Sequence, residues 1–365
     1  MQQLGVTLEE LEVASYQVPT DGPEADGTLS WDSTTMVIAK VYAGGRQGLG
    51  YTYGNQGIAQ LITGLLTKAV VGQDAMNIPG LWLAMVKAIR NQGRPGLSSM
   101  AIAAVDTALW DLKARLLDVP LVVLLGAVRE AVPVYGSGGF TSYSLEQLRK
   151  QLSGWVESGI PRVKMKIGSH PNQDIARVQA ARDAIGPETA LFVDANGAYS
   201  RKQALAMAEA FADYDVSWFE EPVSSDDLEG LRLLRNRLPV GMEVSAGEYG
   251  YDLNYFRRML EAGAVDVLQA DATRCAGITG FLHAGMLCQA YQLPFSSHTS
   301  PNLHAHPACA LPALRHMEYF HDHVRIEELF FEGALKPEQG MLRPAMSRPG
   351  LGLTLRESAV AKYTV

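Results

Sequence analysis

The 365-residue sequence has few cysteines, no long apolar run and no cluster of basic residues. Its three cysteines, Cys275, Cys288 and Cys309, are an odd number without metal-ligand spacing, so we expect them to be reduced and buried in a cytosolic protein. No apolar run approaches the roughly 18 residues that a membrane-spanning helix needs. The 31 basic and 39 acidic residues give a net charge of −8, which argues against nucleic acid and anionic membranes as partners.

The start of the sequence also lacks the pattern of a secretory signal. No lysine or arginine precedes Lys40, and Glu9, Glu10 and Glu12 lie where a signal peptide would be basic and then apolar. We therefore expect a cytoplasmic protein. The apolar fraction of 47% is ordinary for a globular protein, and the negative charge still permits a small anionic substrate, because a metal ion and lysines can outweigh it locally.

Four short apolar runs in the middle of the chain each end in acidic or basic residues. The gaps are 28 residues from Lys166 to Asp194, 26 from Asp194 to Glu220 and 28 from Glu220 to Glu248, about the length of a strand, a helix and two short loops. This spacing predicts a repeated βα unit. In a parallel barrel the carboxyl ends of the strands surround one mouth, so the three carboxylates, Lys164 and Lys166 would share a pocket.

The part of the chain before these repeats predicts an α+β unit. Three runs with β-branched alternation predict strands, at residues 12–17, 33–42 and 49–53. Between the first two, residues 19–28 are rich in Gly, Pro and Asp, which predicts an exposed loop that could act as a lid. Helical patterns follow, the longest at residues 97–117. We expect residues 1–125 to form a capping domain.

The rest of the chain predicts an α/β fold with a (β/α)8-type barrel. From Val132 on, apolar runs alternate with amphipathic helical segments, and eight strands are the number that closes such a barrel. The candidate strands are residues 132–135, 163–167, 190–194, 216–220, 242–246, 265–270, 293–296 and 314–319. We expect residues 126–335 to form the barrel and the Gly- and Pro-rich residues 336–365 to return to the cap and complete it.

Two lysines lie at the end of one predicted strand. Lys164 and Lys166 point to the same face because strand side chains alternate, and Met165 points to the other face. A solvated pair on an exposed strand is the alternative, but Val163 and Ile167 on either side argue against it, because parallel strands are covered on both faces. Packing beside another cation would lower the pKa of a lysine, which suits a base.

The carboxylates predict a magnesium site. Asp194, Glu220 and Glu248 supply hard oxygen ligands without His or Cys, which favours Mg²⁺ over Zn²⁺. A single carboxylate at a strand end is more often a helix cap or a surface charge, but three at regular spacing make that reading less favourable. Glu220 and Glu221 are adjacent and face opposite ways, so only one can be a direct ligand, and the spacing does not choose between them.

Two later strand ends add groups for proton transfer. Asp271 ends the sixth predicted strand and His298 follows the seventh, and a carboxylate beside an imidazole orients it and raises its basicity. A lone histidine is usually structural, so only the position in the repeat favours this dyad. Glu318, on the eighth strand, could reach the same mouth. The four remaining nearby histidines lack a metal-ligand pattern, and we expect no metal cluster from His304, His306, His321 and His323.

Taken together and in order, these motifs resemble the enolase superfamily, and within it the mandelate racemase subgroup. The resemblance covers nearly the whole chain. It is carried by the helix at residues 101–113, Lys164-Met-Lys166, Asp194-Ala-Asn196, Glu220-Glu-Pro222, Ala246-Gly-Glu248, Asp271 and His298. The sequence departs from the family at Ala270, where many relatives have proline, and at Cys275-Ala-Gly277, where a Gly-Gly pair is common.

The resemblance implies a role for each of these residues. Asp194, Glu220 and Glu248 would bind Mg²⁺, which selects Glu220 over Glu221. Lys166 would be an acid/base group on one face of the substrate, with the dyad of His298 and Asp271 on the other. Lys164 would lie next to the substrate carboxylate, and Glu318 would hydrogen-bond the developing enediolate. The resemblance also implies a homo-oligomer.

We therefore expect a Mg²⁺-dependent enzyme that removes the α-proton of a hydroxy-carboxylate, a small-molecule substrate. The leading hypothesis is a lyase that dehydrates a sugar acid to a 2-keto-3-deoxy acid, because an acid/base group on each side can remove the proton and help the β-hydroxyl leave. A racemase or epimerase with the same residues is the alternative, and a catalytically silent Mg²⁺-dependent binding protein is a third possibility. Substrate choice is expected to depend on residues 19–28 and 51–55.

Overall fold

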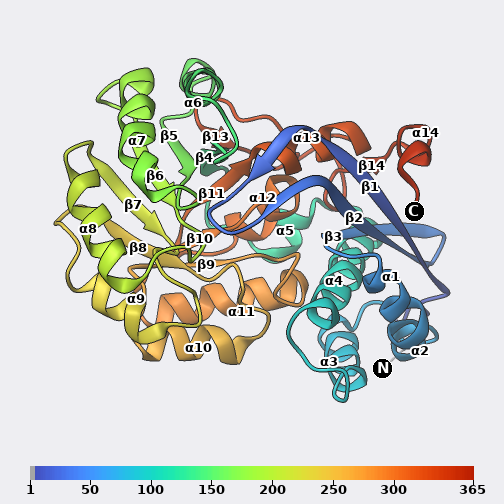
Figure 1. The fold of residues 1–365 in the computed structure, drawn as a ribbon. Coiled ribbons are helices and arrows are strands. Elements are labelled where there is room, and N and C mark those ends of the chain that lie inside the picture. Colours follow the sequence, from blue (N-terminus) through green and yellow to red (C-terminus); the bar gives the residue numbers. More distant parts are fainter. Residues whose placement is uncertain (1–4) are drawn as a thin grey trace.

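The computed structural model describes residues 5–365 and contains a closed parallel barrel beside an antiparallel sheet with its own helices (Figure 1). The three cysteines are free and buried, as the sequence predicted. None of the helices within the described residues has the length and apolar character needed to cross a membrane.

Eight parallel strands form the barrel and follow one another around it in chain order. The last pairs with the first, with Met317 opposite Val134, so the barrel is closed. The strands are β4 (Val132–Gly138), β5 (Arg162–Lys166), β6 (Ala190–Asp194), β7 (Val216–Glu220), β8 (Glu243–Ala246), β9 (Val267–Ala270), β10 (Phe295–Ser297) and β11 (Leu314–Phe320). The predicted eight-stranded barrel is confirmed.

A helix follows each barrel strand and covers the outside of the sheet (Figure 1). Several of them begin at a polar cap: Ser144 and Ser200 each accept a hydrogen bond from the N–H of a glutamine three residues later, whose side chain bonds back. The helices are α6 (Leu145–Glu157), α7 (Pro171–Ile185), α8 (Arg201–Ala212), α9 (Leu228–Arg235), α10 (Leu253–Glu261), α11 (Gly277–Ala290), α12 (Pro301–Cys309) and α13 (His321–Phe330).

The barrel strands place apolar side chains outward against the helices and a separate set inward. Met165 belongs to the outer core, whereas the inner cluster contains Tyr135, Phe192 and Trp218. The rings of Phe192 and Trp218 are stacked with centroids 5.2 Å apart. This aromatic layer fills the barrel, and the ammonium group of Lys164 lies 5.4 Å from the ring centroid of Tyr135. Packed aromatic side chains therefore close the barrel beneath its polar mouth.

The capping part has a three-stranded antiparallel sheet in the order β1-β2-β3 and a set of helices. Helix α4 packs across β3 so closely that a Cβ atom on Gly48 would lie 2.2 Å from the carbonyl oxygen of Ala108, so only glycine fits there. The elements are β1 (Glu10–Ala25), β2 (Ser30–Ala43), β3 (Arg46–Tyr53), α1 (Gly57–Leu61), the π-helix η1 (Ile62–Leu66), α2 (Thr67–Val70), α3 (Ile78–Ala88), α4 (Leu97–Leu116) and α5 (Leu121–Leu125).

The loop predicted at residues 19–28 is wrong for most of its length, because β1 continues to Ala25. The pairing with β2 shifts register between Pro19 and Glu24 and then resumes. Proline is tolerated because β1 is an edge strand, where a missing N–H breaks no pairing. The hairpin reaches the barrel, where the backbone N–H of Thr141 donates to Ala25 O at 2.8 Å, and Figure 1 shows it extending across the barrel mouth.

The end of the chain lies against the cap. The N–H of Leu351 donates to Asp111 on α4 at 2.6 Å, and the N–H of Val365 donates to the carbonyl of Ser15 on β1 at 3.1 Å. The elements here are β12 (Phe331–Glu332), β13 (Met341–Leu342), β14 (Thr354–Leu355), α14 (Glu357–Val360) and the 3₁₀-helix η2 (Ala361–Tyr363). The division into residues 1–125, 126–335 and 336–365 stays a prediction.

A buried carboxyl joins the cap to the barrel and predicts a pH-dependent stability. Asp106 on α4 is fully buried and accepts hydrogen bonds from the N–H (2.9 Å) and hydroxyl (2.7 Å) of Thr279 on α11. Burial raises the pKa of Asp106 to about 7, although the bonds from Thr279 oppose it. Because the folded protein then holds this proton more tightly than the unfolded chain, its contribution to stability is lost as the pH rises toward 7.

Asp106→Asn removes this titration. The free energy of unfolding of wild type relative to Asp106→Asn is expected to fall by about 2.5 kcal/mol between pH 5 and pH 7.5. Urea unfolding of both proteins at the two pH values measures it, and all other titrating groups cancel in the difference. A difference between the two proteins that does not change with pH would contradict this role of Asp106.

Candidate active site

The mouth of the barrel gathers the charged side chains because neighbouring strands pair in register. Lys166 on β5 lies opposite Asp194 on β6, and Asp194 lies opposite Glu220 on β7. Glu248 follows β8 after Gly247, whose φ of +139° and whose close contact with β9 exclude a side chain: a Cβ atom would lie 2.0 Å from the carbonyl oxygen of Gln269. The strand register and this loop therefore place four charged side chains close together at the mouth of the barrel.

The three predicted metal ligands lie together. Asp194, Glu220 and Glu248 are all buried, and each offers a carboxylate oxygen within 4.8 Å of the others. The Oε2 atom of Glu248 is buried and has no hydrogen-bond partner among the described residues. Three buried carboxylates with an unsatisfied acceptor fit a hard divalent cation such as Mg²⁺, which prefers oxygen ligands. Glu221 is not part of this group.

Both lysines point into the mouth, as the alternation of side chains predicted. Lys164 is fully buried, contacts Glu220, and lies 2.8 Å from Glu318 and 3.4 Å from Asp194. Lys166 lies 2.5 Å from Asp194. The expected lowering of a lysine pKa is not found. Burial lowers the pKa of Lys166, and so does Lys164, but Asp194 and other carboxylates raise it by more.

The predicted dyad of Asp271 and His298 is also present. The Nδ1 atom of His298 lies 2.9 Å from Asp271 Oδ2, and Thr273 donates to the other carboxylate oxygen through its N–H and hydroxyl, each at 2.7 Å. Burial raises the pKa of Asp271, but the hydrogen bond from His298 and the charges around it hold that pKa below its usual range. An Asp271 that stays ionised favours the proton on Nδ1, which leaves Nε2 of His298 able to accept a proton.

His298 and Lys166 line the same cavity, together with Glu248 and Glu318. We call this space of about 360 Å³ the mouth cavity; the tip of the β1–β2 hairpin and the end of β3 form its cap side. The Nε2 atom of His298 lies 3.5 Å from Glu248 Oε2 and 3.9 Å from Glu318 Oε2. Glu318 also accepts hydrogen bonds from Ser137 (2.5 Å) and from the N–H of Thr299 (2.8 Å).

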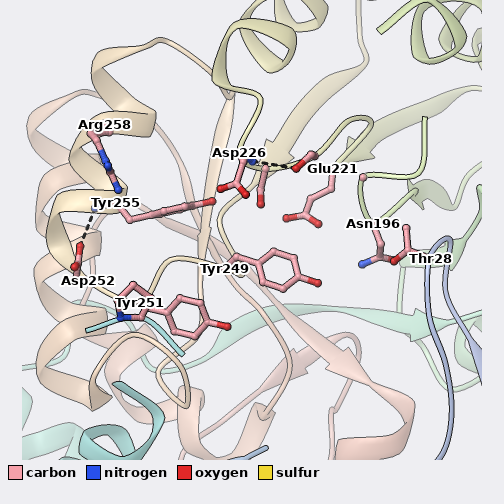
Figure 2. A pocket seen from close by; sticks show the side chains of 13 residues that line it. Thr28, Asn196, Glu221, Asp226, Tyr249, Tyr251, Asp252, Tyr255 and Arg258 are labelled. Carbon is pink, nitrogen blue, oxygen red and sulfur yellow. Dashed lines mark hydrogen bonds between the residues drawn. The ribbon is translucent and has the colours of Figure 1, made fainter. Parts of the chain in front are cut away.

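A larger space of about 600 Å³, which we call the side cavity, adjoins this one (Figure 2). Asn196 and Tyr249 line both cavities. The residues that line the side cavity include neither lysine nor histidine, so its larger volume does not make it the reaction site. Figure 2 shows Glu221 and the ring of Tyr249 facing this space.

Sequence reasoning missed Arg274, which lies between the predicted metal site and the dyad. Its guanidinium is 3.2 Å from Glu248 and 3.7 Å from Asp271, and it covers the ring of Tyr249 at 5.3 Å from the centroid. Its position three residues after Asp271 was the available signal. Such a position is common in a loop, so the contact needed the structure.

The four other histidines singled out in the sequence make different contacts. His304 accepts the N–H of Ala272 at 2.8 Å and His306 accepts the N–H of Val122 at 3.1 Å, so these two are structural. His321 lies instead with Asp21 and Glu24, another group whose geometry could hold an ion.

Comparison with known proteins identifies the family. Residues 147–359 match the model of an enolase C-terminal domain-like fold, and residues 10–126 match the mandelate racemase / muconate lactonizing enzyme N-terminal domain. A mandelate racemase/muconate lactonizing enzyme-like protein from Rubrobacter xylanophilus has 55% sequence identity and a TM-score of 0.97, over 98% of this chain and 100% of that one.

Two further relatives have named activities. Arabinonate dehydratase from Saccharolobus solfataricus is 30% identical over 91% of this chain and 90% of its own length. L-talarate/galactarate dehydratase from Salmonella typhimurium LT2, in a structure liganded with Mg and L-lyxarohydroxamate, has 28% identity and a TM-score of 0.91 over 100% of this chain and 94% of that one. The chain belongs to the enolase superfamily, in the mandelate racemase/muconate lactonizing enzyme subgroup.

Proposed function

We propose that the protein is a Mg²⁺-dependent dehydratase that converts a sugar acid to a 2-keto-3-deoxy acid. The observation that carries the proposal is the mouth cavity, which has Lys166 and His298 on its wall beside three buried carboxylates. The dehydratase activities of the two named relatives support the same reaction class. The substrate is a small carboxylate, and the assembly is a homo-oligomer of unspecified size.

Each residue has a place in this proposal. Asp194, Glu220 and Glu248 would hold Mg²⁺, which when bound supplies positive charge where the substrate carboxylate gains negative charge. Lys164, which already bridges carboxylates at the bottom of the mouth, would donate to one oxygen of the substrate carboxylate. Glu318 would hydrogen-bond the developing enediolate. Burial raises the pKa of Glu318, but Lys164 and the other nearby cations hold that pKa below its usual range, so Glu318 must take up a proton before it can donate this bond. A proton α to a carboxylate is weakly acidic, so its removal needs this concentration of positive charge.

The reaction requires one group that accepts a proton and one that delivers it. His298 presents Nε2 to the cavity, and Asp271 stabilises the imidazolium that forms when Nε2 takes a proton. Lys166 presents an ammonium group, which can donate a proton and can accept one only after it has lost its own. One of the two removes the α-proton, and the other protonates the β-hydroxyl, which leaves as water while the electron pair forms the C2–C3 double bond. The resulting enol takes up a proton at C3 and loses the proton of its C2 hydroxyl, which gives the keto acid. The configuration at C2 decides which group is the base.

A panel of sugar acids incubated with the protein and Mg²⁺ tests the proposal. We expect keto-acid formation from at least one acid, loss of that product when EDTA removes the metal, and loss again in the Lys166→Ala, His298→Ala double variant. Undiminished product in EDTA, or from the double variant, contradicts the mechanism. The keto acid is measured as its semicarbazone.

A racemase or epimerase is the second candidate, because the same two groups could remove a proton from one face and return one to the other. The mouth cavity, lined by both Lys166 and His298, is the observation that favours it. In D₂O, an epimerase exchanges the α-proton of its substrate without forming a keto acid, whereas the dehydratase releases the keto acid.

A further inference from the structure

Given the proposed function, one end of the substrate takes no part in the reaction, and the residues around that end bear on which acid is bound. On the cap side of the mouth cavity, the polar lining groups are the hydroxyls of Ser33, Thr34 and Thr35 and the carboxylates of Asp26 and Asp322; apolar side chains such as Leu29, Trp31 and Met100 line it as well. Asp322 is buried, accepts a hydrogen bond from the Thr34 hydroxyl at 2.5 Å and is paired with Arg325 at 2.6 Å. A ligand that extends toward the cap therefore meets hydroxyl groups and negative charge.

The cations of the mouth cavity are already engaged at its reactive end. Lys166 is paired with Asp194 at 2.5 Å, and Arg274 is shared between Glu248 and Asp271. His323 stacks on the ring of Tyr53 with centroids 3.5 Å apart, and burial lowers its pKa to about 3, so it carries no charge at neutral pH. Among the described residues, Lys166 and Arg274 are the lysine and arginine that line this cavity; Arg325, which pairs with Asp322, does not line it.

The side cavity has the same character (Figure 2). Its lining acidic side chains are Glu221, Asp226 and Asp252, and the cation Arg258 lies at the opposite end from Asn196. Ser224, Ser225 and the phenols of three tyrosines supply hydroxyls.

Three buried polar atoms of residues that line the side cavity lack a protein partner. Asn196 Oδ1, Glu221 Oε1 and Tyr255 Oη have no hydrogen-bond partner among the described residues. Glu221 is 1% exposed, so its carboxylate is available to a ligand and poorly available to bulk water. Such a group favours a ligand with hydroxyl donors over one with a second negative charge, because an unpaired buried acceptor is costly.

We propose that the enzyme acts on an acid with one carboxylate and an uncharged, hydroxylated far end, an aldonic acid, and discriminates against the matching diacid. The far end has carboxylates for neighbours in either cavity. Hydroxyl groups of a ligand donate hydrogen bonds to these oxygens, whereas a second carboxylate is repelled by them and finds as donors mainly the wall hydroxyls, which an uncharged far end can use as well. The two named relatives act on acids of both kinds, so family membership does not decide the question.

Matched pairs of acids test the proposal. D-galactonate and galactarate share their configuration from C2 to C5 and differ at C6, which is a hydroxymethyl group in one and a carboxylate in the other; D-gluconate and D-glucarate form a second pair. For the acid that reacts, kcat/KM is expected to exceed that of its diacid by about 100-fold, the effect of two like charges at partly screened distances. A diacid that reacts as well as its monoacid overturns the proposal.

Binding separates this proposal from the proposed function. In the Lys166→Ala variant with Mg²⁺, calorimetry is expected to show the monoacid of a pair binding at least about tenfold more tightly than the diacid. If no sugar acid gives a keto acid, the proposed dehydratase activity is wrong, but the comparison of monoacid and diacid binding can still be made. A diacid that binds as tightly, or a set of five- and six-carbon monoacids of which none binds, overturns the single-carboxylate assignment.

Substitutions of acidic residues that line the two cavities show which cavity holds the unreactive end of the substrate. Asp322→Asn and Asp26→Asn each remove a charge from the mouth cavity, and Asp226→Asn removes one from the side cavity. We expect the variants of one cavity to narrow the monoacid-to-diacid ratio by about tenfold, and the exposed Glu188→Gln to leave it unchanged. Asp26→Asn keeps a side chain able to form the turn at the hairpin tip. It therefore provides the test of the mouth cavity if Asp322→Asn folds poorly. A ratio that none of the three changes overturns the role of the wall charges.

Discussion

Replacing Lys166 with alanine is expected to lower the rate of keto-acid formation by about 10³-fold, because the variant loses one of the two proton-transfer groups while the other remains. Lys166 lies 2.5 Å from Asp194 inside the mouth cavity, where alanine leaves room for the substrate but no proton carrier. Initial rates with the reacting acid and saturating Mg²⁺ measure the loss.

The matched control is Lys202→Ala, which removes an exposed lysine outside the mouth and is expected to keep the full rate. Proton exchange in D₂O adds a readout that a merely structural role would not change. If His298 removes the α-proton, Lys166→Ala still exchanges that proton with solvent while losing dehydration; if Lys166 removes it, both are lost. A variant that keeps more than about a tenth of the wild-type rate would falsify the assignment of Lys166 to proton transfer.

The barrel and most of the site could be predicted from the sequence because both follow from one regularity. Charged residues at the ends of apolar runs, spaced by one βα unit, must meet at the mouth of a parallel barrel. The register confirms this geometry, with Lys166, Asp194 and Glu220 side by side on β5, β6 and β7. Strand alternation also fixed which way Lys164 and Lys166 face.

The hairpin over the mouth could not be predicted in the same way. Pro19, Gly22 and Pro23 are local signals for a loop, and the prediction of a loop failed because β1 is an edge strand that pairs with β2 on one side only. Contacts with distant residues, such as the hydroxyl of Ser142 donating to Pro23 O at 2.6 Å, hold the segment in place. A sequence window around residue 23 contains no information about residue 142.

The electrostatics of the site also needed the structure. From the sequence, Lys164 was expected to lower the pKa of Lys166, but the number and distance of nearby carboxylates reverse the direction. The contact of Arg274 with Glu248 also needed the structure, because it depends on how the loops after two different strands approach each other. Spacing predicts which groups meet, whereas the sign of a pKa shift depends on distances of a few ångströms.

The adjacent pair Glu220 and Glu221 gives the second large prediction. With Mg²⁺ at about 100 times its dissociation constant, the wild-type protein is expected to gain about 2.7 kcal/mol of unfolding free energy over the metal-free protein. Glu220→Gln removes one of the three clustered carboxylates, and a loss of about 100-fold in affinity leaves a gain of only about 0.4 kcal/mol. Glu221→Gln is expected to keep most of the wild-type gain, because Glu221 is outside that cluster.

The comparison is matched because both variants replace one buried glutamate with the same amide at neighbouring positions. Each protein is compared with itself, with Mg²⁺ and with EDTA, so the effect of the substitution on the metal-free fold cancels. If both variants lose the same amount of Mg²⁺-dependent stability, the ion responds to the summed charge of the mouth. If only Glu220→Gln keeps that stability gain, the ion lies nearer the side cavity. Either result removes the basis for placing the cation among Asp194, Glu220 and Glu248, and with it the account of how the α-proton becomes acidic enough to transfer.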